Sequence, residues 1–599
     1  MLKTLLKSVR EYKLYSILTP ILMVGEAVME IIIPFLMTFI VGELESMAAG
    51  NPINGGNIAL YACLMVLCSA FAMFCGVLGA KLAAKASCGF AHNLREDMYN
   101  NLQTFSFANI DNYSTSSLIT RITTDVTNVQ NAYQMCIRML VRAPILFITA
   151  IVMTLFIEPF MALIFGCAAL LLGVLVSIFM LKAIPYFKTM FKKYDKLNEV
   201  VQEDLTAIRV VKSYVREDKE KGKMKFASEE LYHYSVKAET FMTCLMPAVT
   251  LIMFTVNILI LTLGSNMAVG NITFASVKPS QLQTLIQYSA QILSGVMMVA
   301  MCLTYISMSK GSADRICEVL NERTTLPKAT EPVKEVADGS IVFNNVDFCY
   351  SQKADLMVLQ DLTFTINSGE TVGIIGATGS GKTSLVSLIP RLYDAERGSV
   401  YVGGVDVKNY DLDTLRNSVA MVLQKNVLFS GSIAQNLRWG DENATDEDLR
   451  LACRQACAEE FIEGLPGKYD YDLGQGGVNV SGGQKQRLCI ARALLKKPKI
   501  LIFDDSTSAV DTKTDADIRG ALRKYAPEVT KIIIAQRIAS VQDADKIIVL
   551  DNGRINGIGT HEELIASNEI YREVYESQME SKSDEQSQAS AIKSEGGEE

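Results

Sequence analysis

The sequence predicts an all-α membrane domain of six helices with long cytosolic extensions, followed by a soluble α/β domain built around a P-loop. Three observations lead to this fold class. The 599 residues are too many for a single core, and 49% of them are hydrophobic. Long apolar runs fill the chain to about residue 310, whereas the residues from Leu326 onward have the regular charge of a soluble α/β protein. The second part also contains a glycine-rich loop between a strand and a helix.

Six apolar runs are long enough to cross a bilayer, since a hydrocarbon layer of ~30 Å needs ~20 helical residues. They lie near residues 16–41, 58–84, 133–157, 160–183, 241–265 and 282–307. The first run is too long for a signal peptide and contains two glutamates, so it is expected to remain in the protein.

Basic residues set the expected orientation. Lys3, Lys7, Arg10 and Lys13 precede the first run, while its far loop, Gly42 to Asn57, has no Lys or Arg. Basic residues are expected on the inner side of a membrane. The long polar stretches Lys85–Gln130 and Lys182–Lys237 are basic too and fall on the same side. We expect a multi-pass protein of the cell (inner or plasma) membrane with both termini in the cytoplasm.

Composition divides the chain into four parts: a membrane domain over 1–325, a linker over 326–339, a nucleotide-binding domain over 340–576 and a disordered acidic tail over 577–599. Spans two to five are predicted to extend into the cytosol as helices. Two short segments near their turns, Thr115–Thr124 and Thr206–Tyr214, are expected to dock on the soluble domain. Plain surface helices are the alternative interpretation.

Cysteine usage and charge exclude some function classes. The thirteen cysteines show no paired framework and are expected to be free thiols. Cys453 and Cys457 share a helical face, but the sequence nearby offers no further His or Cys for a zinc site. The net charge of -8 gives no sign of nucleic-acid binding.

The P-loop is the first motif that predicts chemistry. An apolar strand, Thr371–Ile375, precedes it, and a helical run, Ser384–Arg391, follows. Backbone N–H groups of such a loop surround phosphates, a lysine reaches the outer phosphates, and a hydroxyl binds Mg²⁺. The candidate ATP-binding residues here are Gly376, Thr378, Gly379, Ser380, Gly381, Lys382, Thr383 and Ser384.

Two further motifs follow the P-loop along the chain. The buried strand Ile500–Phe503 ends in Asp504 and Asp505, a layout that delivers one carboxylate to a metal and another to an attacking water. Between the strands, Ser481, Gly482, Gly483 and Gln484 form a turn that opens a helix. Such a turn offers donors to an anion, although alone it is more often only a helix cap.

This ordered set resembles the ATP-binding cassette (ABC) family over essentially the whole chain, as an exporter half-transporter of the type IV fold. The resemblance implies that two chains sandwich each ATP between one P-loop and the other chain's signature, Ser481–Gln484. It implies that Tyr350 stacks on adenine, that Gln424 joins Thr383 and Asp504 at Mg²⁺, and that Asp511 contacts the opposite site. The two inner segments become coupling helices.

Three positions depart from the family pattern. Asp505 stands where the family carries a glutamate, which pulls the carboxylate back by about 1.5 Å and could cost around 10²-fold in rate. Gln536 replaces the switch histidine and can hydrogen-bond a γ-phosphate, but it cannot carry a proton at neutral pH. Gln475 replaces a glutamate ahead of the signature. The two catalytic positions, Asp505 and Gln536, are therefore predicted to be degenerate.

These departures resemble the degenerate-site subunit of heterodimeric bacterial multidrug ABC exporters, as does the ending YREVYESQ. The resemblance implies a second half-transporter with a catalytic glutamate, a switch histidine and an altered signature. This chain's own site is then a slow or inactive ATPase that holds ATP and Mg²⁺. Its nearly intact signature, with Val480 in place of leucine, completes the partner's hydrolytic site.

The transported compound is less defined by the sequence. Glu26 and Glu30 share one helical face inside the first span, and they are expected either to line a path for cationic amphiphiles or to make a structural pairing. Small amphiphilic substrates of the multidrug type are the first expectation. A lipid or peptide exporter would share every motif, and a subunit that binds ATP to gate a channel is the remaining alternative.

Overall fold

The computed structural model describes residues 1–48, 50, 55–269, 277–350, 357–505 and 512–579 of the chain. These residues divide into two compact units. The first comprises residues 1–103 and 114–322, and the second comprises residues 104–113 and 323–599. The second unit thus includes a short segment from between the second and third spans.

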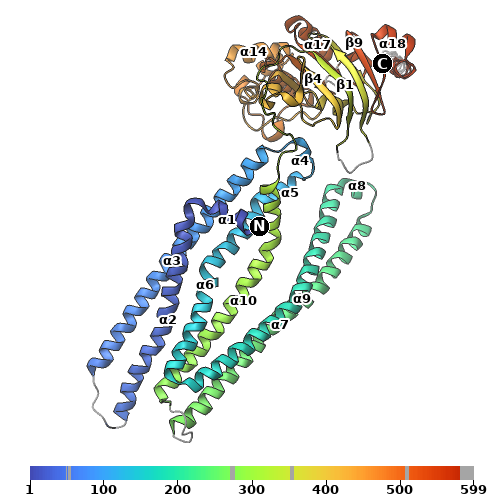
Figure 1. Cartoon of the computed structure of the whole chain (residues 1–599). Helices are drawn as coiled ribbons and strands as arrows, with labels where there is room; N and C mark the ends of the chain where they lie inside the picture. The colour runs from blue at the N-terminus through green and yellow to red at the C-terminus, as the bar shows by residue number, and fades with distance from the viewer. Residues whose placement is uncertain (49, 51–54, 270–276, 351–356, 506–511, 580–599) are drawn as a thin grey trace, which may run out of the picture. The chain divides into compact units, whose positions relative to one another are not determined.

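The first unit, called the membrane unit below, is built from long helices (Figure 1). Six of its helical stretches are long and apolar enough to cross a membrane, and each contains one of the six predicted runs. The expected all-α membrane domain is confirmed. Its helices are α1 (Leu2–Leu6), α2 (Lys13–Ala48), α3 (Gly55–Gln103), α5 (Thr115–Thr120), α6 (Val126–Ile157), α7 (Pro159–Thr206), α8 (Ile208–Ser213), α9 (Glu217–Ala268) and α10 (Pro279–Asn321).

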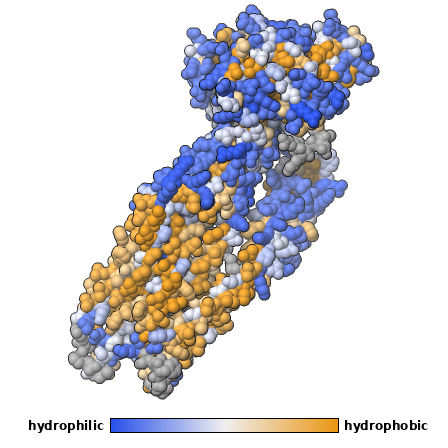
Figure 2. Space-filling model, in the orientation of Figure 1, coloured by the Kyte–Doolittle hydropathy of each residue, from blue (hydrophilic) through white to orange (hydrophobic). Residues whose placement is uncertain are grey.

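The long helices pack in pairs, with α2 along α3, α6 along α10 and α7 along α9. Toward α8, the α7 and α9 pair diverges from the other long helices (Figure 1). Figure 2 shows hydrophobic residues over most of the helical surface and hydrophilic residues at the ends that carry α5 and α8. Such a distribution suits helices that cross a bilayer and continue into water.

The second unit, called the soluble unit below, contains two sheets. The larger has the order β10-β9-β3-β8-β7-β6. Its five strands β9, β3, β8, β7 and β6 run parallel to one another, and β10 is antiparallel to β9. The smaller sheet has the order β2-β1-β4-β5. The strands are β1 (Ile341–Phe348), β2 (Leu359–Ile366), β3 (Thr371–Ile375), β4 (Arg397–Val402), β5 (Val405–Asp406), β6 (Val419–Val422), β7 (Ile500–Asp504), β8 (Thr530–Ile534), β9 (Lys546–Asp551) and β10 (Arg554–Gly559).

The strands β3, β7 and β8 are buried along their whole length, as continuous apolar runs in a parallel sheet require. Helices cover the sheets, and the expected α/β domain is confirmed. Its helices are α4 (Phe107–Asp111), α11 (Lys382–Ser387), α12 (Leu412–Ser418), α13 (Ile433–Leu437), α14 (Asp446–Gln455), α15 (Glu459–Glu463), α16 (Gly482–Leu495), α17 (Thr512–Tyr525) and α18 (His561–Ser567).

One segment boundary differs from expectation, and one segment was not expected. Helix α4 belongs to the second unit, while Thr115–Thr124, which is expected to dock on the soluble domain, lies in the first unit, and its docking stays a prediction. Residues 569–579 are helical, so Ser577–Met579 are part of this helix and not of a disordered tail. The rest of the predicted tail, 580–599, lies outside the described residues.

Candidate nucleotide-binding site

The predicted site residues come together where four neighbouring strands end. The P-loop follows β3, Gln424 follows β6, and Gln536 follows β8, while Asp504 is the last residue of β7. Because the carboxyl ends of parallel strands open at one edge of a sheet, these loops converge. They enclose a cavity of about 340 Å³ lined by Tyr350, Val358, Thr378, Gly379, Gly381, Lys382, Thr383, Ser384, Gln424, Asp504, Asp505, Ile534 and Gln536.

The P-loop backbone depends on two glycines. Gly379 has a φ of +85° and Gly381 a φ of +98°, the left-handed region that glycine adopts without strain. Gly381 is also the residue before α11, so the loop turns directly into the helix that begins at Lys382. The Lys382 ammonium bends back and donates to the carbonyl oxygens of Gly376 at 2.7 Å and Ala377 at 2.8 Å.

The ammonium group of Lys382 is half-buried. Burial lowers the pKa of the Lys382 ammonium, and the nearby carboxylates of Asp505 and Asp504 oppose that effect. The hydrogen-bond acceptors of this half-buried ammonium are neutral, namely two carbonyl oxygens and the Ser380 hydroxyl, so the ammonium would gain from an anionic partner. Lys382 is therefore suited to receive a phosphate group.

The residues expected at Mg²⁺ also lie together. The Thr383 hydroxyl donates to Oδ1 of Asp504 at 2.8 Å, and only 3% of Asp504 is exposed. Burial raises the pKa of the Asp504 carboxyl, and the hydrogen bond from Thr383 lowers it. A hydroxyl and a carboxylate beside a phosphate site are the oxygen donors that Mg²⁺ prefers, so the residues present fit this ion.

The residues at the two predicted catalytic positions, Asp505 and Gln536, bind each other. The Gln536 amide donates to Oδ2 of Asp505 at 2.6 Å, and the Gln424 amide donates to the same oxygen at 3.2 Å. Asp505 adopts a left-handed φ of 48°, and only 8% of the residue is exposed. One carboxylate oxygen has two lone pairs, and here both have amide donors. This oxygen of Asp505 is therefore occupied by protein groups and not directed at a water.

Tyr350, expected to stack on adenine, borders the cavity with 48% of the residue exposed. Its hydroxyl lies 2.8 Å from that of Ser384, and its ring meets the ring of Tyr393 edge to face at 5.2 Å. The sequence reasoning missed Tyr393, which donates to Asp111 of α4 at 2.6 Å and also meets the ring of Phe107. Through Tyr393, α4 contacts the residues that border the nucleotide cavity.

The signature residues lie outside the nucleotide cavity and cap α16. The Ser481 hydroxyl accepts from the backbone N–H of Gln484 at 3.3 Å, and the Gln484 amide oxygen accepts from the backbone N–H of Ser481 at 2.9 Å. Gln475 is exposed a few residues earlier. Asp511, expected to contact the opposite site, lies outside the described residues.

Gln578 holds the loop that carries Gln536, and the sequence gave no sign of this contact. Its amide donates to the Gln536 carbonyl at 2.9 Å, and its amide oxygen accepts from the Ile538 N–H at 2.9 Å. These two bonds attach the last turn of the helix over residues 569–579 to the loop that follows β8. The only available signal was the motif YREVYESQ, which ends on this residue.

Replacing Gln578 with Met is expected to lower ATP affinity about tenfold and ADP affinity much less. The change removes two hydrogen bonds worth about 0.5–1.5 kcal/mol each, and tenfold corresponds to about 1.4 kcal/mol. ATP should be affected more, because the phosphate that Gln536 is predicted to contact is the γ-phosphate, which ADP lacks. Competitive titration of a fluorescent ATP analogue measures both affinities. Glu573→Met, an exposed position on the same helix, is the control. An equal loss for ATP and ADP would contradict a role in positioning the loop.

In the membrane unit, Glu26 and Glu30 of α2 share a cation from α6. Arg142 lies 3.5 Å from Glu26 and 2.5 Å from Glu30. The pairing that the sequence left open is therefore present, and its arginine lies more than one hundred residues away along the chain. Gln291 of α10 donates to the Glu30 carbonyl at 3.0 Å, so three spans meet here.

Comparisons with known proteins agree with this architecture. Residues 16–297 match the family described as the ABC transporter transmembrane region, and residues 359–508 match the family described as ABC transporter. An uncharacterised ABC transporter ATP-binding protein of Bacillus subtilis, YfiB, is 34% identical over 96% of this chain and 98% of its own length. The ATP-dependent lipid A-core flippase of Pseudomonas fluorescens is 32% identical over 85% of this chain and 84% of its own.

A solved structure, that of a bacterial Atm1-family ABC exporter with ATP bound, has the same fold. It superposes with a TM-score of 0.79 at 24% identity and covers 95% of this chain and 98% of its own. Both the six-helix membrane unit and the soluble unit of this chain thus have counterparts in one exporter chain.

Proposed function

Because the chain belongs to the ABC transporter family, as an exporter half-transporter with its membrane domain and cassette in one polypeptide, we propose that it is half of a heterodimeric pump. The pump uses ATP to export amphiphilic compounds of the multidrug type across the cell (inner or plasma) membrane, with both termini of this chain in the cytoplasm. The second half carries a catalytic glutamate, a switch histidine and an altered signature.

The observation that carries this proposal is the bonding of the Asp505 carboxylate to the amides of Gln536 and Gln424. A general base must reach the proton that it abstracts, and a shorter side chain held by two amides is poorly placed to do so. Lys382 and Thr383 line the same cavity, where their side chains suit a phosphate and Mg²⁺. The site then binds ATP well and hydrolyses it slowly, so it acts as a nucleotide clamp.

Thr383 and Asp504 would hold Mg²⁺ through their oxygens, and Gln424, whose side-chain N–H donates to Asp505, would offer its amide oxygen. Bound with ATP, the ion would neutralise phosphate charge and complete this clamp. Hydrolysis takes place at the other site of the dimer, where Ser481 to Gln484 of this chain face the partner's ATP.

Purification of the tagged chain from its native membranes tests the pairing. We expect it to bring down a second half-transporter whose sequence has the complementary glutamate, histidine and altered signature. Mass spectrometry identifies the second chain, and a phosphate-release assay measures turnover by the pair. An active homodimer with a normal ATPase rate would overturn the proposal.

We further propose that Glu26 and Glu30 border the substrate path. Two carboxylates and the single guanidinium of Arg142 leave one negative charge inside the membrane, where charges usually face a bundle interior or a wet cavity. Such a charge favours cationic amphiphiles over anionic ones.

The double change Glu26→Gln and Glu30→Gln is expected to reduce transport of cationic dyes about tenfold and to leave uncharged dyes within about twofold, because only the cations lose an attraction of roughly 1.4 kcal/mol. Dye accumulation in inverted vesicles measures both. Glu43→Gln, farther along α2, is a matched control outside the cluster. Unchanged transport of cationic dyes would assign the cluster a structural role alone.

A lipid exporter is the second candidate function, and it is favoured by the lipid A-core flippase among the relatives. Adding lipids of defined head group to the purified pair would stimulate its ATPase several-fold if lipid is the substrate. Two further measurements distinguish the remaining alternatives. A peptide exporter would transport labelled peptides, and a gating subunit would support ion currents without ATP turnover.

A further inference from the structure

A cavity of about 190 Å³ lies in the membrane unit between α7, α9 and α10. Its walls come mostly from α7 and α10. The lining is largely apolar and includes Ile184, Phe187, Phe191 and Met308, together with Lys188 and Ser307. A cavity of this kind, apolar with a few polar groups, is the usual form of a site that binds a small apolar or amphiphilic ligand.

The cavity begins where the packing of these three helices ends. A cluster of buried residues joins the helices through Leu172, Val176, Leu245, Val249 and Ala300. On the next turns toward the cytosolic extensions, Phe191 is 43% exposed and Met308 59% exposed. Pro185 lies inside α7 at this level, and a proline removes a helical hydrogen bond and usually bends the helix. The cavity is therefore the space left open where α7 and α9 diverge from α10 (Figure 1).

The predicted spans give the depth of this cavity in the bilayer. The spans within α7, α9 and α10 reach their cytosolic ends near residues 183, 241 and 307, and the lining lies at these ends. In the expected orientation, the boundary between hydrocarbon and headgroups of the cytosolic leaflet falls at this level. Lipids of that leaflet can therefore reach the cavity with both their acyl chains and their headgroups.

Lys188 gives the cavity a positive charge. Among the described residues that line the cavity, it is the only charged one. Its side chain is exposed and has no ion-pair or hydrogen-bond partner in the described part of the chain. Farther along α7, by contrast, Lys193 pairs with Glu230 at 2.8 Å and Lys196 with Glu199 at 2.9 Å. The Lys188 ammonium is thus available to an anionic ligand beside an apolar cavity.

We propose that the cavity binds an anionic phospholipid of the cytosolic leaflet. One acyl chain packs against Phe187, Phe191 and Met308. The lipid phosphate binds the Lys188 ammonium, and the exposed Ser307 hydroxyl donates to the same phosphate from α10. Hydrogen bonds to a charged group are roughly twice as strong as neutral ones, and basic pockets between spans on the cytoplasmic side suit anionic headgroups.

This lipid site is distinct from the proposed substrate path. Glu26 and Glu30 favour cationic amphiphiles, whereas Lys188 repels them. The volume of about 190 Å³ is also smaller than the ~300–1,000 Å³ of pockets that enclose a whole drug-sized molecule. It suits one chain of a lipid whose remainder stays in the bilayer. The inference concerns the membrane unit of this chain, so it holds for a heterodimeric and for a homodimeric pump.

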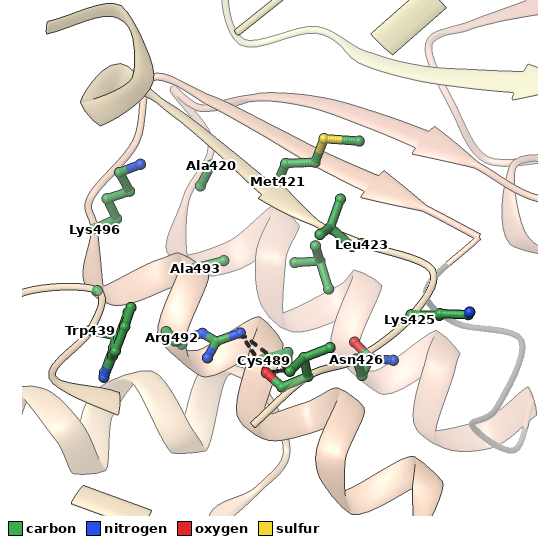
Figure 3. A pocket seen from close by; sticks show the side chains of 13 residues that line it. Ala420, Met421, Leu423, Lys425, Asn426, Trp439, Cys489, Arg492, Ala493 and Lys496 are labelled. Atoms are coloured by element: carbon green, nitrogen blue, oxygen red, sulfur yellow. Dashed lines mark hydrogen bonds between the residues drawn. The ribbon is translucent and has the colours of Figure 1, made fainter. Parts of the chain in front are cut away.

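The test measures lipid association by tryptophan fluorescence in the full-length protein, reconstituted in vesicles with any partner that co-purifies. Phe191→Trp places a reporter at the cavity, and phospholipids with brominated acyl chains quench a tryptophan that they contact. The unmodified protein gives the background, to which this chain contributes its single tryptophan, Trp439, at a groove of the soluble unit (Figure 3). Competition with unbrominated lipid gives the relative association constants of phosphatidylglycerol and phosphatidylcholine.

The Phe191→Trp protein is expected to bind phosphatidylglycerol about fivefold more tightly than phosphatidylcholine, the factor that one lysine contributes near an anionic surface. Adding Lys188→Gln should lower this ratio to about one, and adding Lys188→Arg should preserve it, because only the first change removes the charge. Lys182→Gln is the matched control, since Lys182 is exposed on the same helix but does not line the cavity. It should leave the ratio near fivefold.

Three results would overturn the lipid site. They are a ratio near one with Lys188 in place, a ratio unchanged by Lys188→Gln, and an equal loss of preference in Lys182→Gln. The last result would assign the preference to the general charge of the membrane surface. ATP binding should be the same in all variants, so that a changed ratio reports on the cavity and not on folding. The ratio is independent of ATP turnover, so failure of the heterodimer proposal would leave it unchanged.

Discussion

The double variant Asp505→Glu with Gln536→His is expected to raise ATP turnover at this chain's own site about 100-fold. The measurement uses the two-chain complex with the partner's catalytic glutamate changed to Gln, so that phosphate release reports on the site at Lys382 alone. The added methylene moves the carboxylate forward by about 1.5 Å, and a misplacement of about 1 Å near the chemistry can cost 10²-fold. The histidine restores a group that can carry a proton.

Neither single change is expected to achieve this gain. In Asp505→Glu, Gln536 and Gln424 remain available to bind the longer carboxylate as they bind the present one. In Gln536→His, the carboxylate stays too far back. Residues that form one hydrogen-bonded network show non-additive effects, so the double variant should exceed the product of the two singles.

Gln542→His is the matched control, because this exposed residue follows the same strand but lies outside the cavity. Turnover should stay at the wild-type level in that variant. If the wild-type site already turns over as fast as the double variant, the clamp interpretation is wrong. If the double variant binds ATP normally and remains slow, the departure that limits the site lies elsewhere, and Gln475 is the next candidate.

The sequence was sufficient to predict the parts of the site that belong to short continuous motifs. The P-loop, Asp504 and Gln536 each follow a short apolar strand, and parallel strands bring their carboxyl ends to one edge of the sheet. Strand patterns and motif spacing therefore predicted both the α/β fold and the meeting of these residues. The bonding of Gln536 to Asp505 adds a detail that neither motif contains.

The missed features depend on contacts between residues far apart in the chain. Arg142 on one helix pairs with Glu26 and Glu30 on another. A charged residue in the sequence does not by itself reveal which residue it pairs with. Gln578 reaches a loop forty residues earlier, from a stretch whose polar composition resembled a disordered tail. Composition measures how much apolar surface a segment can bury, and it does not record two well-placed hydrogen bonds.

Helix α4 was missed for a related reason. The pattern around Thr115–Thr124 fits a compact amphipathic helix, and the structure does contain α5 there. The segment in the soluble unit is nevertheless α4, whose five residues are too few for a helical period to stand out. Its identity comes from the contact of Asp111 with Tyr393, which joins residues 282 positions apart.

The second large effect concerns the signature. Gly482→Asp in this chain is expected to lower ATP turnover of the two-chain complex at least 100-fold, although the changed residue lies in the chain whose own site is proposed to be slow. In the proposed dimer this residue faces the γ-phosphate of the partner's ATP. A carboxylate there repels the phosphate and removes a close backbone approach.

The structure indicates that this variant folds. A Cβ at Gly482 would meet no atom within 4 Å, and an acidic residue in the first turn of α16 is favoured by the helix dipole. Gly520→Asp offers a matched control, since Gly520 also has open space and is exposed in α17. We expect normal turnover from the control and normal ATP binding at Lys382 in both.

Asp505→Asn distinguishes the two roles of this chain within the same assay. It should leave turnover of the complex within about threefold, because in the proposed dimer hydrolysis occurs at the partner's site and Asp505 is bound by amides in its own. A large loss from Gly482→Asp together with a small one from Asp505→Asn requires that this chain contributes more through its signature than through its own catalytic position. The opposite ranking would locate hydrolysis at Lys382 and remove the basis for a degenerate site.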